Sequence, residues 1–169
     1  MHCPCGSQLL IDDCCLPIIE HKKVASSPEH LMRSRYTAYT LKNAKYIYDT
    51  YAEKNRNQQS IPDIQDWADQ TKWLKLTILH SSSFPNLSTD KNTKYAKIND
   101  DMPTVTFSAS YIFENKLFTM TEQSRFTIEN NQWHYVDGEY SSDDGEKLPN
   151  RNSNCPCGST KKFKRCCGK

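Results

Sequence analysis

The sequence predicts an α+β protein with a small cysteine-rich segment at each end. Apolar residues recur with helical spacing between residues 28 and 70, and they alternate with polar residues between 72 and 135. Helices followed by an antiparallel meander are typical of the α+β class. All eight cysteines lie in residues 1–15 and 155–169. We therefore expect an N-terminal knuckle (1–20), a central domain (26–140), a linker (141–154) and a C-terminal knuckle (155–169).

Three helices are expected before residue 71. Ser26 or Ser27 followed by Pro28 is typical of a helix start, and an apolar stripe continues from there to Tyr39. Arg35 lies inside this stripe. A second, shorter helix is expected from residue 44 to about residue 53, and a third around residues 62–70.

Four strands are expected after residue 71. Leu74, Leu76 and Ile78 alternate with polar residues and predict one apolar face of the first strand. The remaining strands are marked by alternating aromatic and β-branched residues. The expected strands are 72–80, 105–113, 118–128 and 133–135, separated by a long loop at 81–103 and by turns at 114–115 and 130–131.

The composition indicates one compact domain with appendages. The chain has 169 residues and a formal net charge of +2. The mean hydropathy of −0.81 is low, but aromatic residues make up 11% of the chain and supply a large apolar area per residue. No apolar run approaches the length of a membrane span, and no secretory signal precedes the first cysteines. We expect a cytoplasmic protein.

The two cysteine clusters share one spacing, Cys-x-Cys followed by eight residues and Cys-Cys. They consist of Cys3, Cys5, Cys14 and Cys15, and of Cys155, Cys157, Cys166 and Cys167. Four thiols within so short a segment suit a tetrahedral Zn²⁺ ion with no open position, which is a structural site. We expect two Zn²⁺ per chain, because cytosolic thiols stay reduced. The alternatives are disulfide staples, metal-free thiols, or His2 replacing Cys15 as a ligand.

One candidate site lies in the centre of the chain. The alternation that turns Phe118 and Phe126 inward also turns Glu122 inward, where a carboxylate is costly unless it is paired. Arg35 is the expected partner, in a buried structural ion pair, with Arg33 as the second candidate and His80 as the third. Alternatively, Glu122 is a general base or a ligand anchor inside a cavity. We find no other catalytic pattern, so a non-enzymatic role is favoured and no substrate can be assigned.

The residues also resemble a known family. Residues 155–168 resemble the SEC-C motif at the C-terminus of the translocation ATPase SecA. The resemblance is extended by the N-terminal cysteine segment and by residues 31–39, 124–126 and 133–138. Taken together, nearly the whole chain looks like a member of the YchJ-like family. The resemblance implies a central domain with the cone-shaped fold of nuclear transport factor 2 and no established activity. In SecA the motif is linked to the chaperone SecB and to the ribosome.

The two knuckles differ in charge. The C-terminal copy carries Lys161, Lys162, Lys164 and Arg165 around Phe163 and contains no acid. We expect this basic surface, with its aromatic ring, to contact a protein partner or the ribosome. The alternative is that its lysines only keep a terminal tail solvated. The N-terminal copy has the apolar residues 9–11 in the equivalent loop, and we expect it to dock on the central domain.

Overall fold

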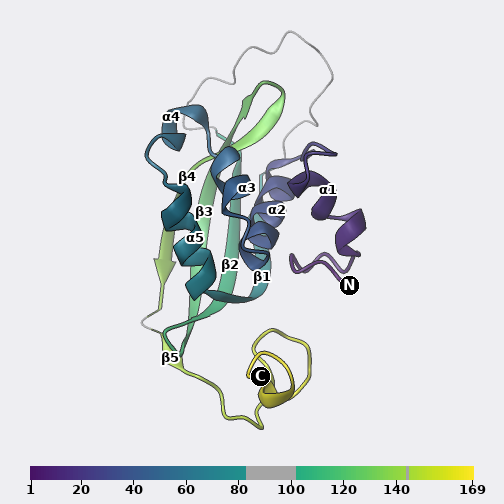
Figure 1. Ribbon diagram of the computed structural model, residues 1–169, viewed down its shortest axis with the longest axis vertical. Coiled ribbons are helices and arrows are strands. Elements are labelled where there is room, and N and C mark those ends of the chain that lie inside the picture. Colours follow the sequence, from purple (N-terminus) through teal and green to yellow (C-terminus); the bar gives the residue numbers. More distant parts are fainter. Residues whose placement is uncertain (83–101, 144) are drawn as a thin grey trace.

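The computed structural model describes residues 1–82, 102–143 and 145–169, and it has helices packed on an antiparallel sheet (Figure 1). The elements follow one another in chain order. They are the short helix η1 (Ile11–Asp13), α1 (Leu16–Ile19), α2 (Pro28–Thr40), α3 (Ala44–Asp49), α4 (Glu53–Arg56), α5 (Ile61–Gln70), β1 (Lys72–Ser81), β2 (Thr104–Phe113), β3 (Lys116–Glu129), β4 (Gln132–Ser142), β5 (Glu146–Lys147) and the short helix η2 (Phe163–Arg165).

The sheet is a meander with the strand order β1-β2-β3-β4, and β5 adds to one end of β3. Both expected turns are present. Glu114 and Asn115, like Asn130 and Asn131, have φ between 46° and 60°, the left-handed conformation that tight hairpins require. The α+β class and the meander are thus confirmed.

The helices lie across one face of the sheet and bury it (Figure 1). The side chain of Ser27 accepts a hydrogen bond from the His30 backbone N–H and so begins α2. The core combines residues from α2 and α3 with the inward residues of the strands. Its members include Leu31, Tyr36, Ile47, Leu76, Val105, Phe107, Ala109, Phe126 and Trp133.

The end of α3 is joined to β4 by backbone hydrogen bonds. The N–H of Tyr135 donates to the Thr50 carbonyl at 2.8 Å, and the N–H of Ala52 donates to the Tyr135 carbonyl at 2.7 Å. The predicted second helix therefore ends at Asp49, and residues 53–56 form α4 separately. This junction brings Thr50 and Tyr51 beside the inner face of β4.

Two expectations need correction. In β1, the register with β2 shifts between Trp73 and Lys75, so Trp73 rather than Leu74 pairs across from Tyr111. The segment expected to be a plain linker contains β5, which pairs with Lys116 and Leu117 of β3. Most of the loop expected at 81–103 lies outside the described residues.

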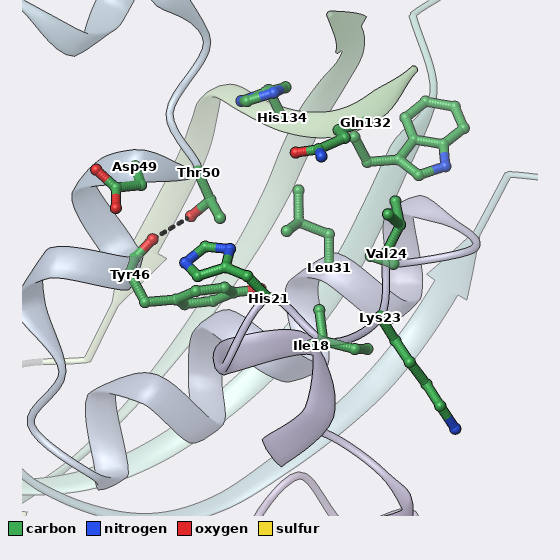
Figure 2. Close-up of a pocket in the computed structure, with 12 residues that line it drawn as sticks. Ile18, His21, Lys23, Val24, Leu31, Tyr46, Asp49, Thr50, Gln132 and His134 are labelled. Atoms are coloured by element: carbon green, nitrogen blue, oxygen red, sulfur yellow. Dashed lines mark hydrogen bonds between the residues drawn. The ribbon is translucent and has the colours of Figure 1, made fainter. Parts of the chain in front are cut away.

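A small pocket of about 150 Å³ lies where the segment after α1 meets α3 and β4 (Figure 2). The ring of His21 lies 5.8 Å from that of Tyr46, and His134 is on the opposite wall. Burial lowers the pKa of His134, whose Nδ1 lies 3.3 Å from the Tyr51 carbonyl. Among the described helices, none has the length and apolar character needed to cross a membrane.

Candidate metal centres and a central cavity

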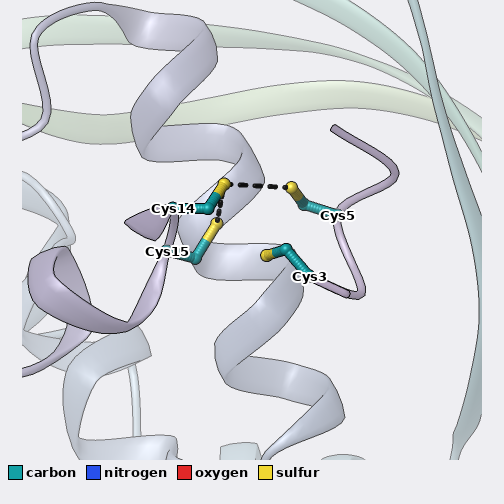
Figure 3. Close-up of side chains that lie close together, drawn as sticks. All are labelled: Cys3, Cys5, Cys14 and Cys15. Atoms are coloured by element: carbon teal, nitrogen blue, oxygen red, sulfur yellow. Dashed lines mark hydrogen bonds between the residues drawn. The ribbon is translucent and has the colours of Figure 1, made fainter. Parts of the chain in front are cut away.

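The first cysteine cluster gathers four sulfur atoms between the N-terminal loop and the start of α1 (Figure 3). The Sγ atoms of Cys5 and Cys14 are 3.7 Å apart, as are those of Cys14 and Cys15. All four lie within 4.8 Å of one another. The vicinal pair converges because Cys14 ends η1 with φ −121° and ψ −99°, outside the helical region.

The second cluster repeats this geometry. The Sγ atom of Cys166 is 3.5 Å from that of Cys157 and 3.8 Å from that of Cys167, and Cys166 has a similar backbone, with φ −136° and ψ −109°. Gly6 and Gly158 take φ of 79° and 81°, so both loops need glycine at the same place. The sequence repeat therefore encodes one structure twice.

A hydroxyl supports each cluster in the same way. Ser7 Oγ lies 3.2 Å from Cys14 Sγ, and Ser159 Oγ lies 3.2 Å from Cys166 Sγ. The N–H of Cys3 donates to the Leu9 carbonyl at 2.8 Å, and the N–H of Cys155 donates to the Lys161 carbonyl at 2.8 Å. These bonds shape each loop around its sulfur atoms.

The sulfur positions fit a metal ion. With metal–sulfur bonds of about 2.3 Å, the edges of a tetrahedron of thiolates are about 3.8 Å. The measured separations of 3.5–3.8 Å match that edge and are far longer than a disulfide bond. All eight cysteines are free thiols. The two clusters are therefore consistent with two metal ions per chain, and neither contains His2, whose ring Nδ1 lies 3.1 Å from the Gln8 carbonyl.

The thiols of each cluster differ in acidity. Hydrogen bonds with Cys15 and then Cys3 lower the pKa of Cys5, whereas hydrogen bonds with Cys3 and then Cys5 raise the pKa of Cys15. In the second cluster burial acts to raise the pKa of Cys157, but hydrogen bonds with Ser159, Cys155 and Cys166 together outweigh it and lower the value to about 6. The lowered pKa of the second cysteine in each cluster favours its thiolate, the form that binds a metal.

The N-terminal knuckle is docked on the central domain, as expected, but of the expected apolar residues 9–11 only Ile11 takes part. Arg33 of α2 donates from Nη1 to the Cys5 carbonyl at 2.7 Å, and Ile11, Ile18 and Ile19 are in the core. Leu9 and Leu10, at 53% and 49% exposed, do not take part. Thr37 of α2 also lies against this knuckle, with its Oγ1 3.6 Å from Cys3 Sγ. The contact surface therefore consists of the cluster and the isoleucines.

The C-terminal knuckle exposes cations but not its aromatic ring. Lys161, Lys162 and Arg165 are exposed and Lys164 is half-buried. Phe163 is only 5% exposed, and a Cβ on Gly168 would come within 2.6 Å of its ring. The expected contact of Phe163 with a partner is therefore wrong, because the ring is the core of its own knuckle. Lys72 of β1 donates to the Cys167 carbonyl at 2.7 Å and ties the knuckle to the sheet.

Glu122 and Arg35 both line a larger cavity of about 510 Å³ between the helices and the sheet, yet they form no ion pair in the described structure. Arg35 donates from Nη1 to the Ile47 carbonyl at 2.8 Å and to Thr50 Oγ1 at 2.6 Å. Its guanidinium carbon lies 4.5 Å from the ring centroids of both Tyr51 and Tyr135. The predicted pairing is thus wrong, because carbonyl oxygen and aromatic rings compensate this cation.

Glu122 points inward, as predicted, but other residues stabilise its carboxylate. Its Oε1 accepts hydrogen bonds from Ser124 Oγ at 2.7 Å and from the Tyr135 hydroxyl at 2.9 Å. A Cβ on Gly138 would lie 2.3 Å from the same oxygen, so glycine leaves the space that the carboxylate fills. The expected second partner, Arg33, instead pairs with Glu29 at 2.8 Å.

Comparison with known proteins agrees with this architecture. Residues 27–138 match the family model described as YchJ, middle NTF2-like domain, and residues 151–169 match the SEC-C motif. A SEC-C motif containing protein from Rhodopseudomonas palustris, solved in solution, is 31% identical with a TM-score of 0.68, over 82% of this chain and 98% of that one.

A second solved structure extends the match to the whole chain. The crystal structure of a SEC-C motif containing protein from Psychrobacter arcticus is 28% identical with a TM-score of 0.65, and it covers 99% of this chain and 96% of that one. The family match spans most of the chain and includes α2 and the cavity-lining strands. The chain therefore belongs to the YchJ family, with a middle NTF2-like domain followed by a SEC-C motif.

Proposed function

We propose that this protein is a non-enzymatic zinc-binding adaptor whose C-terminal knuckle binds an anionic macromolecular surface, on a protein partner or on the ribosome. The observation that carries the proposal is the contrast between two knuckles of the same internal structure. One is built into the central domain, and the other turns exposed cations outward.

Zinc is the proposed metal because each cluster supplies four thiolates and, among the residues that the structure describes, no other ligand. Such a donor set satisfies tetrahedral Zn²⁺ completely, and the residues leave no open position for a substrate. Bound metal would act as a structural staple in segments too small to be held together by apolar packing alone. Elemental analysis of the purified, reduced protein tests this, and the expected result is two zinc ions per chain.

The charge balance favours the C-terminal knuckle as the binding surface. Four thiolates around a divalent ion add a net charge of about −2 to each knuckle. The C-terminal copy stays positive because residues 155–169 hold five Lys and Arg side chains and no acid. The N-terminal copy, with Asp12 and Asp13, becomes more negative. An anionic partner is therefore attracted to one end of the chain only.

The binding test replaces Lys161, Lys162, Lys164 and Arg165 together by Ser. We expect the variant to retain its zinc, to bind purified ribosomes at least tenfold more weakly, and to show a flatter dependence of affinity on salt. A matched control replaces four exposed lysines elsewhere, namely Lys22, Lys54, Lys75 and Lys116.

The control distinguishes binding by this local surface from attraction by the total charge of the protein. If both variants lose affinity equally, the attraction is a general charge effect and the proposal is wrong. If the first variant binds ribosomes as tightly as the parent, the proposal is also wrong for ribosomes. Affinity capture with and without residues 150–169 then tests for a protein partner that depends on this knuckle.

A further inference from the structure

We propose that the 510 Å³ cavity binds a small planar aromatic carboxylate. The cavity lies between α2, α5 and the inner face of the sheet, and its volume is in the range of small-molecule sites. This inference concerns the central domain and is independent of the function proposed for the knuckles.

The walls of the cavity favour a flat aromatic ligand. Trp67, Trp73 and Tyr111 form a connected group of rings, with centroids 5.1–5.8 Å apart and planes tilted by 46° and 72°. Tyr36 and Tyr39 of α2 extend this group, with ring centroids 5.7 and 5.5 Å from that of Trp73. A planar ring entering such a space gains edge and face contacts on several sides.

Unpaired hydrogen-bond donors favour an acceptor on that ligand. The indole Nε1 of Trp73 is buried and has no hydrogen-bond partner in the described structure. Arg35, only 4% exposed, uses Nη1 for both of its hydrogen bonds, and none joins Nε or Nη2 to a described residue. A buried donor without a partner costs free energy, and a carboxylate oxygen would remove that cost.

The acceptor side of the cavity is partly engaged. Glu122 is the only carboxylate among the lining residues that the structure describes, and its Oε1 accepts two hydrogen bonds from protein hydroxyls. Burial raises the pKa of Tyr39 to about 12, so its hydroxyl stays a neutral potential donor. The two rings best placed for a cation, Tyr51 and Tyr135, already hold Arg35. Against the one carboxylate oxygen that has no hydrogen-bond partner among the described residues, Glu122 Oε2, Arg35 offers the unused N–H groups of both Nε and Nη2, so the donors favour an anion over an amine.

The test uses three probes of one shape and different charge, titrated into the full-length protein with its metals bound. The probes are 2-naphthoate, neutral 2-naphthamide and cationic 2-naphthylmethylammonium. We expect 2-naphthoate to bind at least tenfold more tightly than the amide, by calorimetry. In NMR spectra the indole N–H resonance of Trp73 is expected to move downfield on binding, as a new hydrogen bond requires.

Two variants identify the groups that recognise the anion. Trp73→Phe retains a ring but removes the N–H, and it should weaken binding of 2-naphthoate about tenfold, as loss of a hydrogen bond to a charged group predicts. Glu122→Gln keeps an acceptor for Ser124 and Tyr135 but removes a negative charge, and it should strengthen binding. Glu139→Gln, at an exposed residue of β4 paired with the exposed Gln123, makes the same change in net charge and should have little effect.

The outcomes decide the proposal. Tightest binding of the cationic probe, weakened by Glu122→Gln, would mean that the cavity recognises an amine and would overturn it. Equal affinity for all three probes, or no binding of 2-naphthoate at millimolar concentration, would overturn it as well. A Trp73→Phe variant that folds as the parent does and binds 2-naphthoate with unchanged affinity would remove the donor on which the argument depends.

Discussion

The hydroxyl of Tyr135 donates a hydrogen bond of 2.9 Å to Glu122 Oε1. The ring of the same tyrosine lies 4.5 Å from the guanidinium carbon of Arg35. Tyr135 therefore stands between the two opposite charges of the cavity and stabilises each by a different interaction. It keeps them apart while leaving both on the cavity wall.

Substitutions of Tyr135 should separate what each of these two interactions contributes to the free energy of unfolding. Tyr135→Phe loses only the hydrogen bond and should lower the free energy of unfolding by about 1–2 kcal/mol. Tyr135→Leu also removes the cation–π contact and should cost about 1–2 kcal/mol more. Urea unfolding measures both, and Tyr140→Phe, at a residue 72% exposed, is the control expected to change little. Equal losses for Phe and Leu would contradict a role for the ring.

Loss of the N-terminal metal should destabilise the central domain, whereas loss of the C-terminal metal should not. Cys5→Ser is expected to undock a knuckle that contributes Ile11, Ile18 and Ile19 to the core, at a cost of at least about 3 kcal/mol. Cys157→Ser should change the stability of that domain by less than about 1 kcal/mol. Urea unfolding followed by tryptophan fluorescence checks this, and equal losses would contradict it.

A chelator should remove the C-terminal metal first. Three cysteines of the first cluster are buried, whereas only Cys155 of the second is. Metal release depends on access to the thiolates and on local opening of the knuckle. The rate is measured with a chromogenic chelator on Cys5→Ser and Cys157→Ser, each of which retains one cluster intact. Faster release from Cys157→Ser than from Cys5→Ser would show the opposite order.

Stability should fall below about pH 6.5 because of His134. Burial lowers the pKa of this residue in the folded protein, so the unfolded chain takes up a proton at a higher pH than the folded one. The contribution of neutral His134 to the free energy of unfolding is complete above the pKa of the unfolded state. It decreases as the pH falls toward the pKa of the folded state. In His134→Gln, the slope of unfolding free energy against pH between 6.5 and 5 should be smaller. An unchanged slope would exclude His134 as the source of the pH dependence of stability.

Much of the fold could be predicted from periodicity and local signals. Ser27 and Pro28 mark the start of α2, the paired residues 114–115 and 130–131 mark the hairpins, and the repeated cysteine spacing predicts two equal clusters. Each of these depends on residues close together in the sequence. The inward direction of Glu122 followed from alternation along a strand that has no register shift before Arg125.

The cavity residues were harder to predict because they depend on tertiary detail. Alternation assigned the inner face of β1 to Leu74, but the irregularity after Trp73 turns the indole inward instead. Arg35 was assigned an acid as its partner, whereas a carbonyl of α3, a hydroxyl and a ring just after α3, and a ring of β4 surround it. No local pattern reports that the end of α3 would be joined to Tyr135. Phe163 was misjudged because so small a knuckle still needs an apolar centre.

The matching hydrogen bonds of Ser7 and Ser159 have a consequence for how such proteins diversify. The same inner framework exists in a knuckle packed into the core and in one tied to the sheet by Lys72, so it does not depend on its surroundings. Selection can then change the outward residues at either end without loss of the metal-holding loop. Two copies of such a segment allow one copy to become part of the core while the other acquires a new binding specificity.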